Sequence, residues 1–264
     1  MQLTREDFQK FLYTYNEDEL FYRTLYFEKK EHPETFHKFC LNLDCDLISR
    51  RQLYVPELQK EGWHSYFEEK AMFCDTADNI MLYKHYRYTP EFIHKHEFFE
   101  ILCIYDGQAH TSIQGIEHTL HKGDVCIIPP HTKHSVGVFD DSIAVNILIR
   151  GTTFQSTFFQ ALTADSALAQ FFAHVLYRKT EGNYLIFHTG NDVRICDMLE
   201  TMYIEYLAHE KYSYTFLNSM LILFWAMLLR YHENDIESIL TKDTSGNSMT
   251  EILNYLNHHY QTAT

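Results

Sequence analysis

The chain has 264 residues, with 22 Lys plus Arg against 36 Asp plus Glu, and its formal net charge is -14 with histidine neutral. Hydrophobic residues make up 45% and aromatic residues 16% of the chain, which excludes a largely disordered protein. The acidic balance opposes binding of the chain as a whole to a phosphate backbone.

The first residues, MQLTREDFQK, lack the basic start and the apolar stretch of a secretory signal. The longest apolar run, Met220 to Leu229, is half as long as the roughly twenty residues that span a bilayer. The six cysteines form no CxxC pair, which is typical of reduced thiols. We therefore expect a cytoplasmic protein that does not enter the membrane.

The first two parts of the chain differ in their apolar pattern. Residues 1–79 show no sustained alternation, and stretches such as Glu17 to Lys30 indicate a mostly helical N-terminal extension. Residues 80–150 consist of short segments rich in Val, Ile, Phe, Tyr and Thr between turn signals, which predicts six or seven strands of a small barrel or sandwich. The clearest alternation, Ile143 to Ile149, predicts a strand with one face in the core.

Residues 151–240 have a helical apolar period. Two early segments carry Phe154, Phe158 and Leu162, and then Leu168, Phe171, Phe172 and Val175. A short strand at Tyr184 to Phe187 is predicted next, and then an antiparallel pair of helices, the first capped near Asp192 and the second running from Phe216 to Leu228. The second helix is apolar nearly all round, so we expect it to pack on its partner and on either the barrel or a second subunit.

The pattern at the end of the chain predicts a linker followed by one helix. Residues 241–248, TKDTSGNS, are small and polar, and residues 249–264 have the apolar spacing of a single helix.

Histidine is concentrated in the barrel, because eight of the 17 histidines lie between residues 85 and 134. His94 and His96 are two apart on a predicted strand and face the same side, Glu100 shares their parity, and His134 follows the Pro-Pro turn at 129–130. If the barrel brings these four residues together, they suit iron, manganese, zinc or nickel. The alternatives are a metal-free site that binds the hydroxyls of an organic ligand, or purely structural roles.

These residues resemble the two cupin motifs. His94, His96, Glu100 and Gly107 have the spacing H-x-H-x3-E-x6-G, and Gly123, Pro129 and His134 have the spacing G-x5-P-x4-H. The chain departs from the motifs at three positions, where Tyr88 and His131 stand for glycine and Val138 for asparagine.

The segment HKHEFFEILCIYDGQAHTSIQGIEHTLHKGDVCIIPPHTKHSV resembles the effector-binding barrel of AraC-type bacterial transcription regulators. The helix pair after the barrel resembles the coupling or dimerisation helices of that family, and ILNYLNHHY resembles the first helix of its DNA-binding module. The resemblance implies a cupin-like barrel (jelly roll) at 80–150, a helical coupling or dimerisation segment at 151–240 and a stub of the DNA-binding module at 249–264. With the helical extension at 1–79 and the linker at 241–248, which the residue pattern indicates, the expected fold class is α+β.

In that family two helix-turn-helix units follow, whereas here the last 16 residues contain no Lys or Arg. We therefore expect a chain truncated before the DNA-binding module, with no DNA-binding residue of its own and no catalytic residue.

The resemblance implies the sensor and dimerisation part of a regulator that forms a homodimer and binds a small polar effector, sugar-like or another metabolite. His94, His96, Glu100 and His134 are the candidates for ligand or metal binding, and Phe98, Tyr88 and His110 are further candidates for the pocket. The alternative function is a metal-dependent cupin oxygenase or isomerase that uses the same four ligands.

Overall fold

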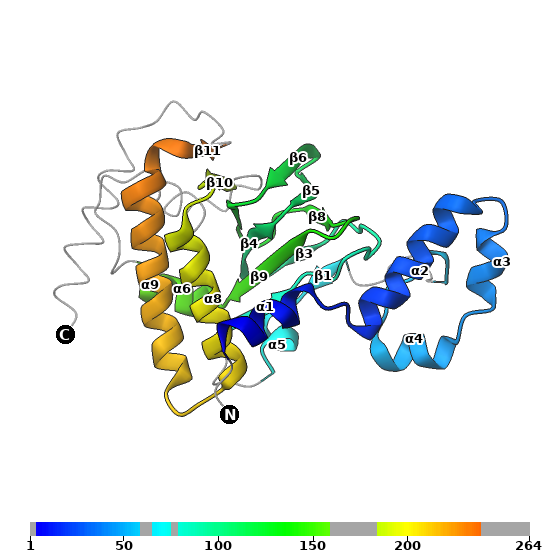
Figure 1. Cartoon of the computed structure of the whole chain (residues 1–264), viewed down its shortest axis with the longest axis horizontal. Helices are drawn as coiled ribbons and strands as arrows, with labels where there is room; N and C mark the ends of the chain where they lie inside the picture. Colours follow the sequence, from blue (N-terminus) through cyan, green and yellow to red (C-terminus); the bar gives the residue numbers. More distant parts are fainter. Residues whose placement is uncertain (1–3, 59–64, 75–78, 159–183, 239–264) are drawn as a thin grey trace.

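The computed structural model describes residues 4–58, 65–74, 79–158 and 184–238. A barrel of strands lies between two groups of helices, with α2, α3 and α4 on one side and α6, α8 and α9 on the other (Figure 1). The helices before the barrel are α1 (Arg5–Tyr13), α2 (Glu17–Glu31), α3 (Phe36–Leu41), α4 (Cys45–Arg51) and α5 (Glu69–Met72). This α+β arrangement confirms the predicted cupin-like fold with helices at both ends.

The first two helices begin at residues suited to capping. Thr4 and Asp7 form a capping box at the start of α1, and Asn16 and Glu19 form another at the start of α2. Each box satisfies backbone N–H groups that have no partner inside the helix. These two capping boxes explain why the N-terminal part of the chain begins with helices, as predicted.

The barrel consists of a large and a small sheet. The large sheet has the order β11-β10-β7-β4-β9-β2 and the small one has the order β6-β5-β8. Their strands are β2 (Ile80–Lys84), β4 (Phe99–Asp106), β5 (Gln108–Ile113), β6 (Ile116–His121), β7 (Asp124–Ile128), β8 (His134–Gly137), β9 (Ile143–Ile149), β10 (Leu185–His188) and β11 (Ile236–Ser238). The two-residue strands β1 (Tyr66–Phe67) and β3 (Lys95–His96) pair in parallel beside them.

Eight strands, β2 to β9, lie between residues 80 and 149. The prediction of six or seven strands was too low, because a strand as short as β3 shows no alternation in the sequence.

Strand β9 lies between β4 and β2, and all seven of its residues are buried. Its residues Ile143, Val145, Ile147 and Ile149 belong to the core shared with α1, α8 and α9, while Ala144 belongs to the core inside the barrel. The prediction of a single core face was therefore wrong, because helices cover the outer face of this sheet as well.

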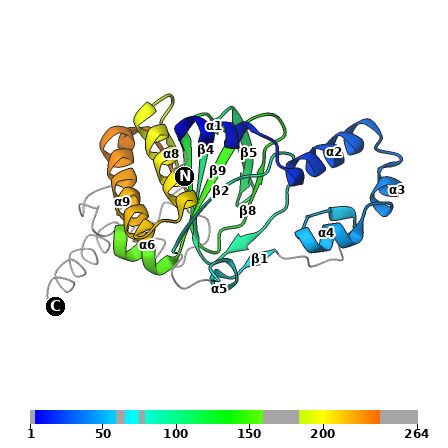
Figure 2. The same cartoon turned by 60° about the horizontal axis from the view of Figure 1, so that its bottom comes forward.

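Helix α6 (Gly151–Phe158) follows the barrel, and the helices α8 (Val193–Ala208) and α9 (Ser213–His232) form the predicted antiparallel pair. Both lie along the outer face of the large sheet (Figure 2). Asp192 caps α8 by accepting from the N–H of Arg194, and its carboxylate also accepts a 2.8 Å hydrogen bond from Nε2 of His232 at the end of α9. The helix pair is thus closed by a loop at one end and by this contact at the other.

The segment Ser213–Asp235 is long and apolar enough to span a membrane by length and composition, as core helices of soluble proteins also are. In this structure Leu221, Phe224 and Leu228 of α9 are buried in the core formed with α8 and the sheet. The predicted apolar helix at Leu168 to Val175, the linker at 241–248 and the helix at 249–264 lie outside the described residues.

A buried ion network joins α2 to the barrel. The Glu19 carboxylate is fully buried, and it accepts hydrogen bonds from Nζ of Lys84 (2.6 Å) and from Nε of Arg87 (2.8 Å). Burial alone would raise the pKa of Glu19, but the hydrogen bonds from Arg87 and Lys84 lower it below its usual value. The Arg87 guanidinium also lies 3.5 Å from the centre of the Tyr15 ring. Charge, hydrogen bonding and stacking thus hold the N-terminal helices against the end of β2.

We expect Glu19→Gln to lower the free energy of unfolding by about 3–5 kcal/mol, because it leaves the buried Lys84 and Arg87 charges without a counterion. Glutamine keeps the capping contact with Asn16, so the change removes mainly the charge. The matched control is Glu17→Gln on the same helix, whose side chain is 80% exposed and pairs with Arg51. Urea denaturation of this control should show a loss below about 1 kcal/mol, and equal losses in both variants would contradict the expectation.

Candidate functional site

Backbone pairing brings the predicted histidines together. The N–H of His94 donates to the carbonyl of His134 (2.9 Å), and the N–H of His134 donates to the carbonyl of His94 (3.0 Å). This antiparallel bridge places the centres of the two imidazole rings 4.1 Å apart. The contact joins the segment before β3 to the start of β8, and strands β3 to β7 and the Pro-Pro turn lie between them in the chain.

A bend between β3 and β4 brings Glu100 to the same place. The chain leaves the strand conformation at Glu97 and Phe98, and Glu100 then lies near the start of β4. Its Oε2 is 3.1 Å from Nε2 of His96 and 3.2 Å from Nε2 of His134. One ligand atom each from His94, Glu100 and His134 lies within 4.8 Å of the others. The four residues predicted to meet are therefore adjacent, and we call them the His/Glu set.

The other ring nitrogen of each imidazole contacts a nearby backbone carbonyl. Nδ1 lies 3.2 Å from the Phe92 oxygen in His94, 2.7 Å from the Phe98 oxygen in His96 and 3.0 Å from the Thr132 oxygen in His134. A carbonyl only accepts hydrogen bonds, so each Nδ1 carries the hydrogen. In the neutral ring, Nε2 is then an unprotonated acceptor, and in His96 and His134 it faces the Glu100 carboxylate. This orientation by backbone carbonyls is the one found for metal-ligating histidines.

Burial and close contacts shift the pKa values of three members of this set. Burial lowers the pKa of His94 to about 3, and it also lowers the pKa of His96. Burial alone would raise the pKa of Glu100, but the contacts with His134 and His96 hold it well below the usual range. A carboxylate oxygen 3.1 and 3.2 Å from two Nε2 atoms needs a hydrogen or a cation between it and each of them, and deprotonated ligands are the form that binds a metal.

The distances also fit a metal. Ligand atoms 3.1 and 3.2 Å apart are compatible with one ion at about 2.0–2.2 Å from each of them. His94, Glu100 and His134, with His96 beside them, would hold a first-row divalent ion, which would act as a Lewis acid toward a bound oxygen atom.

A cavity of about 200 Å³ opens beside the His/Glu set. His94, His96 and Glu100 line it, and the predicted pocket residue Phe98 lines it as well, with its ring stacked on His96 at 4.4 Å. Aromatic side chains form much of the remaining wall, among them Tyr22 from α2, Phe67, Tyr86 and Phe92.

Two predicted pocket residues lie elsewhere. Tyr88 has a left-handed backbone with φ of 63° and packs against Tyr26 and Phe27 of α2. His110 is exposed on β5, where its Nδ1 contacts the Thr119 hydroxyl.

Sequence reasoning missed three further polar residues that line the cavity, Tyr83, His85 and Asn146. Asn146 was visible as the one polar residue in the apolar strand IAVNILI. The alternation predicted its face, but not that this face lines a cavity.

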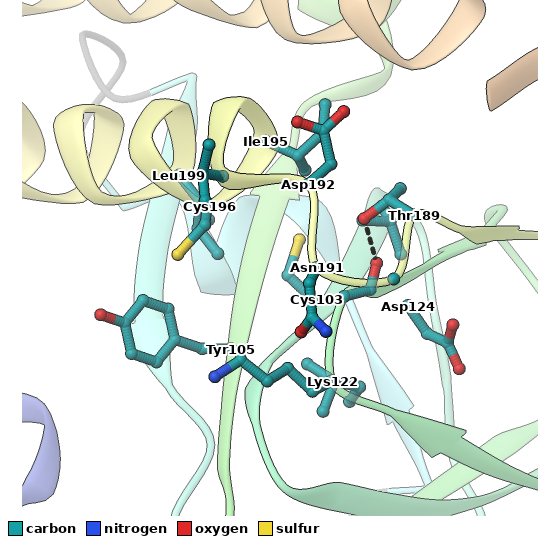
Figure 3. Close-up of a pocket in the computed structure, with 15 residues that line it drawn as sticks. Cys103, Tyr105, Lys122, Asp124, Thr189, Asn191, Asp192, Ile195, Cys196 and Leu199 are labelled. Carbon is teal, nitrogen blue, oxygen red and sulfur yellow. Dashed lines mark hydrogen bonds between the residues drawn. The ribbon is translucent and has the colours of Figure 1, made fainter. Parts of the chain in front are cut away.

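A second cavity, of about 230 Å³, lies outside the barrel between the start of α8 and strands β4 and β7 (Figure 3). Two of its polar side chains already have partners in the protein, because Thr189 donates to the Gly123 carbonyl (2.6 Å) and Asp124 accepts from the N–H of His121 (2.7 Å). The barrel cavity contains the His/Glu set and unpartnered polar atoms, so we place the candidate site there.

Residues 82–203 match the AraC-like ligand binding domain family. The matched segment begins on β2 and ends on α8, and it contains the whole His/Glu set. The match confirms the predicted likeness to an AraC-type effector-binding domain for this part of the chain.

The chain is also similar in fold to solved structures. ToxT from Vibrio cholerae is 16% identical, with 66% of this chain and 61% of that chain covered and a TM-score of 0.41. KdgF from Halomonas sp. is 21% identical, with 27% of this chain and 69% of that chain covered and a TM-score of 0.25. An RmlC-like cupin from Shewanella frigidimarina is 20% identical, with coverages of 28% and 68% and a TM-score of 0.26. No curated protein matches the sequence.

We expect micromolar Zn²⁺ or Mn²⁺ to raise the melting temperature of the protein, because an ion that binds only the folded state stabilises it. Glu100→Gln removes the carboxylate of the set and should weaken metal binding by at least about 10- to 100-fold. Isothermal titration calorimetry measures both affinities. His110→Asn, at an exposed histidine of the same barrel, is the control and should bind as the wild type does, whereas unchanged affinity in Glu100→Gln would contradict the metal assignment.

Proposed function

We propose that the chain is the effector-binding and dimerisation part of an AraC-type transcription regulator in the cytoplasm. The observation that carries the proposal is that the AraC-like ligand binding match coincides with a cavity that the His/Glu set and aromatic side chains line. DNA binding is assigned to a separate module of the regulator, because a net charge of -14 opposes contact with phosphates.

The effector in this proposal is a small polar molecule, sugar-like or another metabolite. Its hydroxyls meet the His/Glu set at one end of the cavity, and its apolar faces lie on the aromatic wall. A metal in the set would bind an effector oxygen, and without a metal the Nε2 and carboxylate acceptors would receive effector hydroxyl hydrogens. Calorimetric titration of the wild type and of Glu100→Gln with a metal ion separates these two cases.

Strand β2 connects the cavity to the helices. Tyr83 lines the cavity, while the N–H of the next residue, Lys84, donates a 2.7 Å hydrogen bond to the hydroxyl of Tyr203 on α8. The Lys84 side chain reaches Glu19 on α2. An effector that binds one position of β2 more tightly than another would therefore bias the position of both helices.

Helix α9 supplies the surface for dimerisation in this proposal. Phe216 and Leu223 are seven residues apart on one side of the helix, and they are 55% and 50% exposed. Adjacent exposed apolar side chains of this size favour contact with another protein surface, here a second copy of the chain.

A metal-dependent cupin enzyme is the second candidate. The backbone carbonyls that orient the three imidazoles favour it, because they prepare a ligand set. The helix pair packed on the barrel favours the regulator. Near-stoichiometric iron, manganese, zinc or nickel in the purified protein, together with turnover of a substrate, would establish the enzyme instead.

We expect at least one compound in a panel of sugars and other metabolites to raise the melting temperature and to slow hydrogen exchange in α8 as well as in the barrel. Tyr203→Phe removes the hydrogen bond to β2, so it should keep the affinity for that compound but lose most of the protection in α8. A panel without any stabilising compound, or protection confined to the barrel in both proteins, would contradict the proposed sensor.

We expect the wild type to sediment as a dimer, and Phe216→Ser combined with Leu223→Ser to raise the dimer dissociation constant about tenfold or more. Leu207→Ser on α8, which is 41% exposed, is the control and should leave the dimer intact. A monomeric wild type in analytical ultracentrifugation would exclude this surface as a dimer interface.

A further inference from the structure

Two polar atoms in the barrel cavity lack a hydrogen-bond partner within the described part of the chain. They are Oδ1 of Asn146 and Nε2 of His85, and both residues line the cavity. Asn146 is only 2% exposed. Buried amide groups are nearly always satisfied in folded proteins, so an unpartnered one that lines a cavity points to a missing hydrogen-bonding group.

The strand register fixes where these atoms lie. Tyr83 on β2 is directly opposite Asn146 on β9, and Nδ2 of Asn146 donates a 2.9 Å hydrogen bond to the Tyr83 hydroxyl. His85 continues β2 through a 2.9 Å bond from its N–H to the carbonyl of Ala144, so it lies on the same side of the strand as Tyr83. If the Asn146 amide were rotated by 180°, its Nδ2 would face the cavity instead, and one amide group would still need a partner.

The chemistry of this wall is specific. An amide group and an imidazole nitrogen side by side accept from or donate to a hydroxyl, which can do both at once. Among the described residues that line the cavity there is no Lys or Arg, so no cationic side chain would compensate a negative charge on the ligand at this end. The aromatic side chains that line the cavity offer flat apolar faces.

We infer that Tyr83, His85 and Asn146 form a second polar anchor, which takes a hydroxyl group of a ligand that is uncharged at that end. The ligand contacts both this anchor and the His/Glu set, because Glu100 on β4 is diagonally opposite Asn146 on β9. The inference rests on the proposed function, since it names the class of effector for the same cavity. It also assigns specificity to residues on β2 and β9, which lie outside both cupin motifs.

The test compares two changes of a buried polar residue to an apolar one of similar size. Asn146→Leu removes the anchor, and Thr111→Val removes a buried hydroxyl that already donates to the carbonyl of Ser135 (2.7 Å). Melting temperatures are measured without ligand and with tens of millimolar D-glucose, D-mannitol or myo-inositol. D-gluconate and D-glucosamine, which carry a charge on a related skeleton, are run beside them.

We expect at least one uncharged polyol to stabilise the wild type and Thr111→Val, and to bind Asn146→Leu at least about tenfold more weakly. Without ligand, Asn146→Leu should melt closer to the wild type than Thr111→Val does, because removal of the unsatisfied Oδ1 offsets the lost hydrogen bond from Nδ2 to the Tyr83 hydroxyl. Thr111→Val loses a satisfied hydrogen bond and should melt below the wild type. Together these results separate ligand recognition from a structural role.

Three results would overturn the inference. If a polyol raises the melting temperature of Asn146→Leu as much as that of the wild type, the cavity binds an effector but Tyr83, His85 and Asn146 do not anchor it. A fall in the ligand-free melting temperature of Asn146→Leu as large as that of Thr111→Val would make the amide structural, and a response to D-gluconate alone would exclude the uncharged class. If no compound stabilises the wild type, the inference fails together with the proposed effector site.

Discussion

The buried carboxylate of Glu19 is the contact on which the arrangement of the barrel and the N-terminal helices depends. It neutralises two cations that leave opposite ends of the same short segment, Lys84 and Arg87, and neither cation could be buried without it. Because Glu19 also completes the cap of α2, the start of that helix and the end of β2 are fixed by one side chain. Tyr22, one turn further along α2, is thereby held in the wall of the cavity.

The same segment shows how one sheet serves two purposes. Residues of β2 and β9 alternate between the helix-covered core on the outer face and the cavity or inner core on the other. A residue on one face cannot shift without moving its neighbours on the other face, since both are fixed to the same pleated backbone. Among the described strands, β2 pairs only with β9, and the N–H of Lys84 on β2 contacts the hydroxyl of Tyr203.

Much of this organisation was predictable from the sequence. The spacing of His94, His96, Glu100 and His134 predicted their convergence, and the helical periods at Ile195 and Leu221 predicted the pair on the sheet. The burial of both faces of β9 was not predictable, because alternation within a strand does not show what covers its outer face. The sequence pattern also did not show that Tyr88 and His110 lie outside the cavity, because it does not show what each side chain packs against. A positive φ turned Tyr88 toward the N-terminal helices, whose packing depends on contacts between residues far apart in the chain.

The Asp192 contact determines how the helix pair can move. Its carboxylate caps α8 and holds the last turn of α9 through His232, while the loop after Ala208 joins the other ends. A hairpin closed at both ends has no free end at which the two helices can spread apart. A displacement of β2 would therefore turn α8 and α9 together as one rigid body, and the lever arm of that rotation would be the full length of the longer helix.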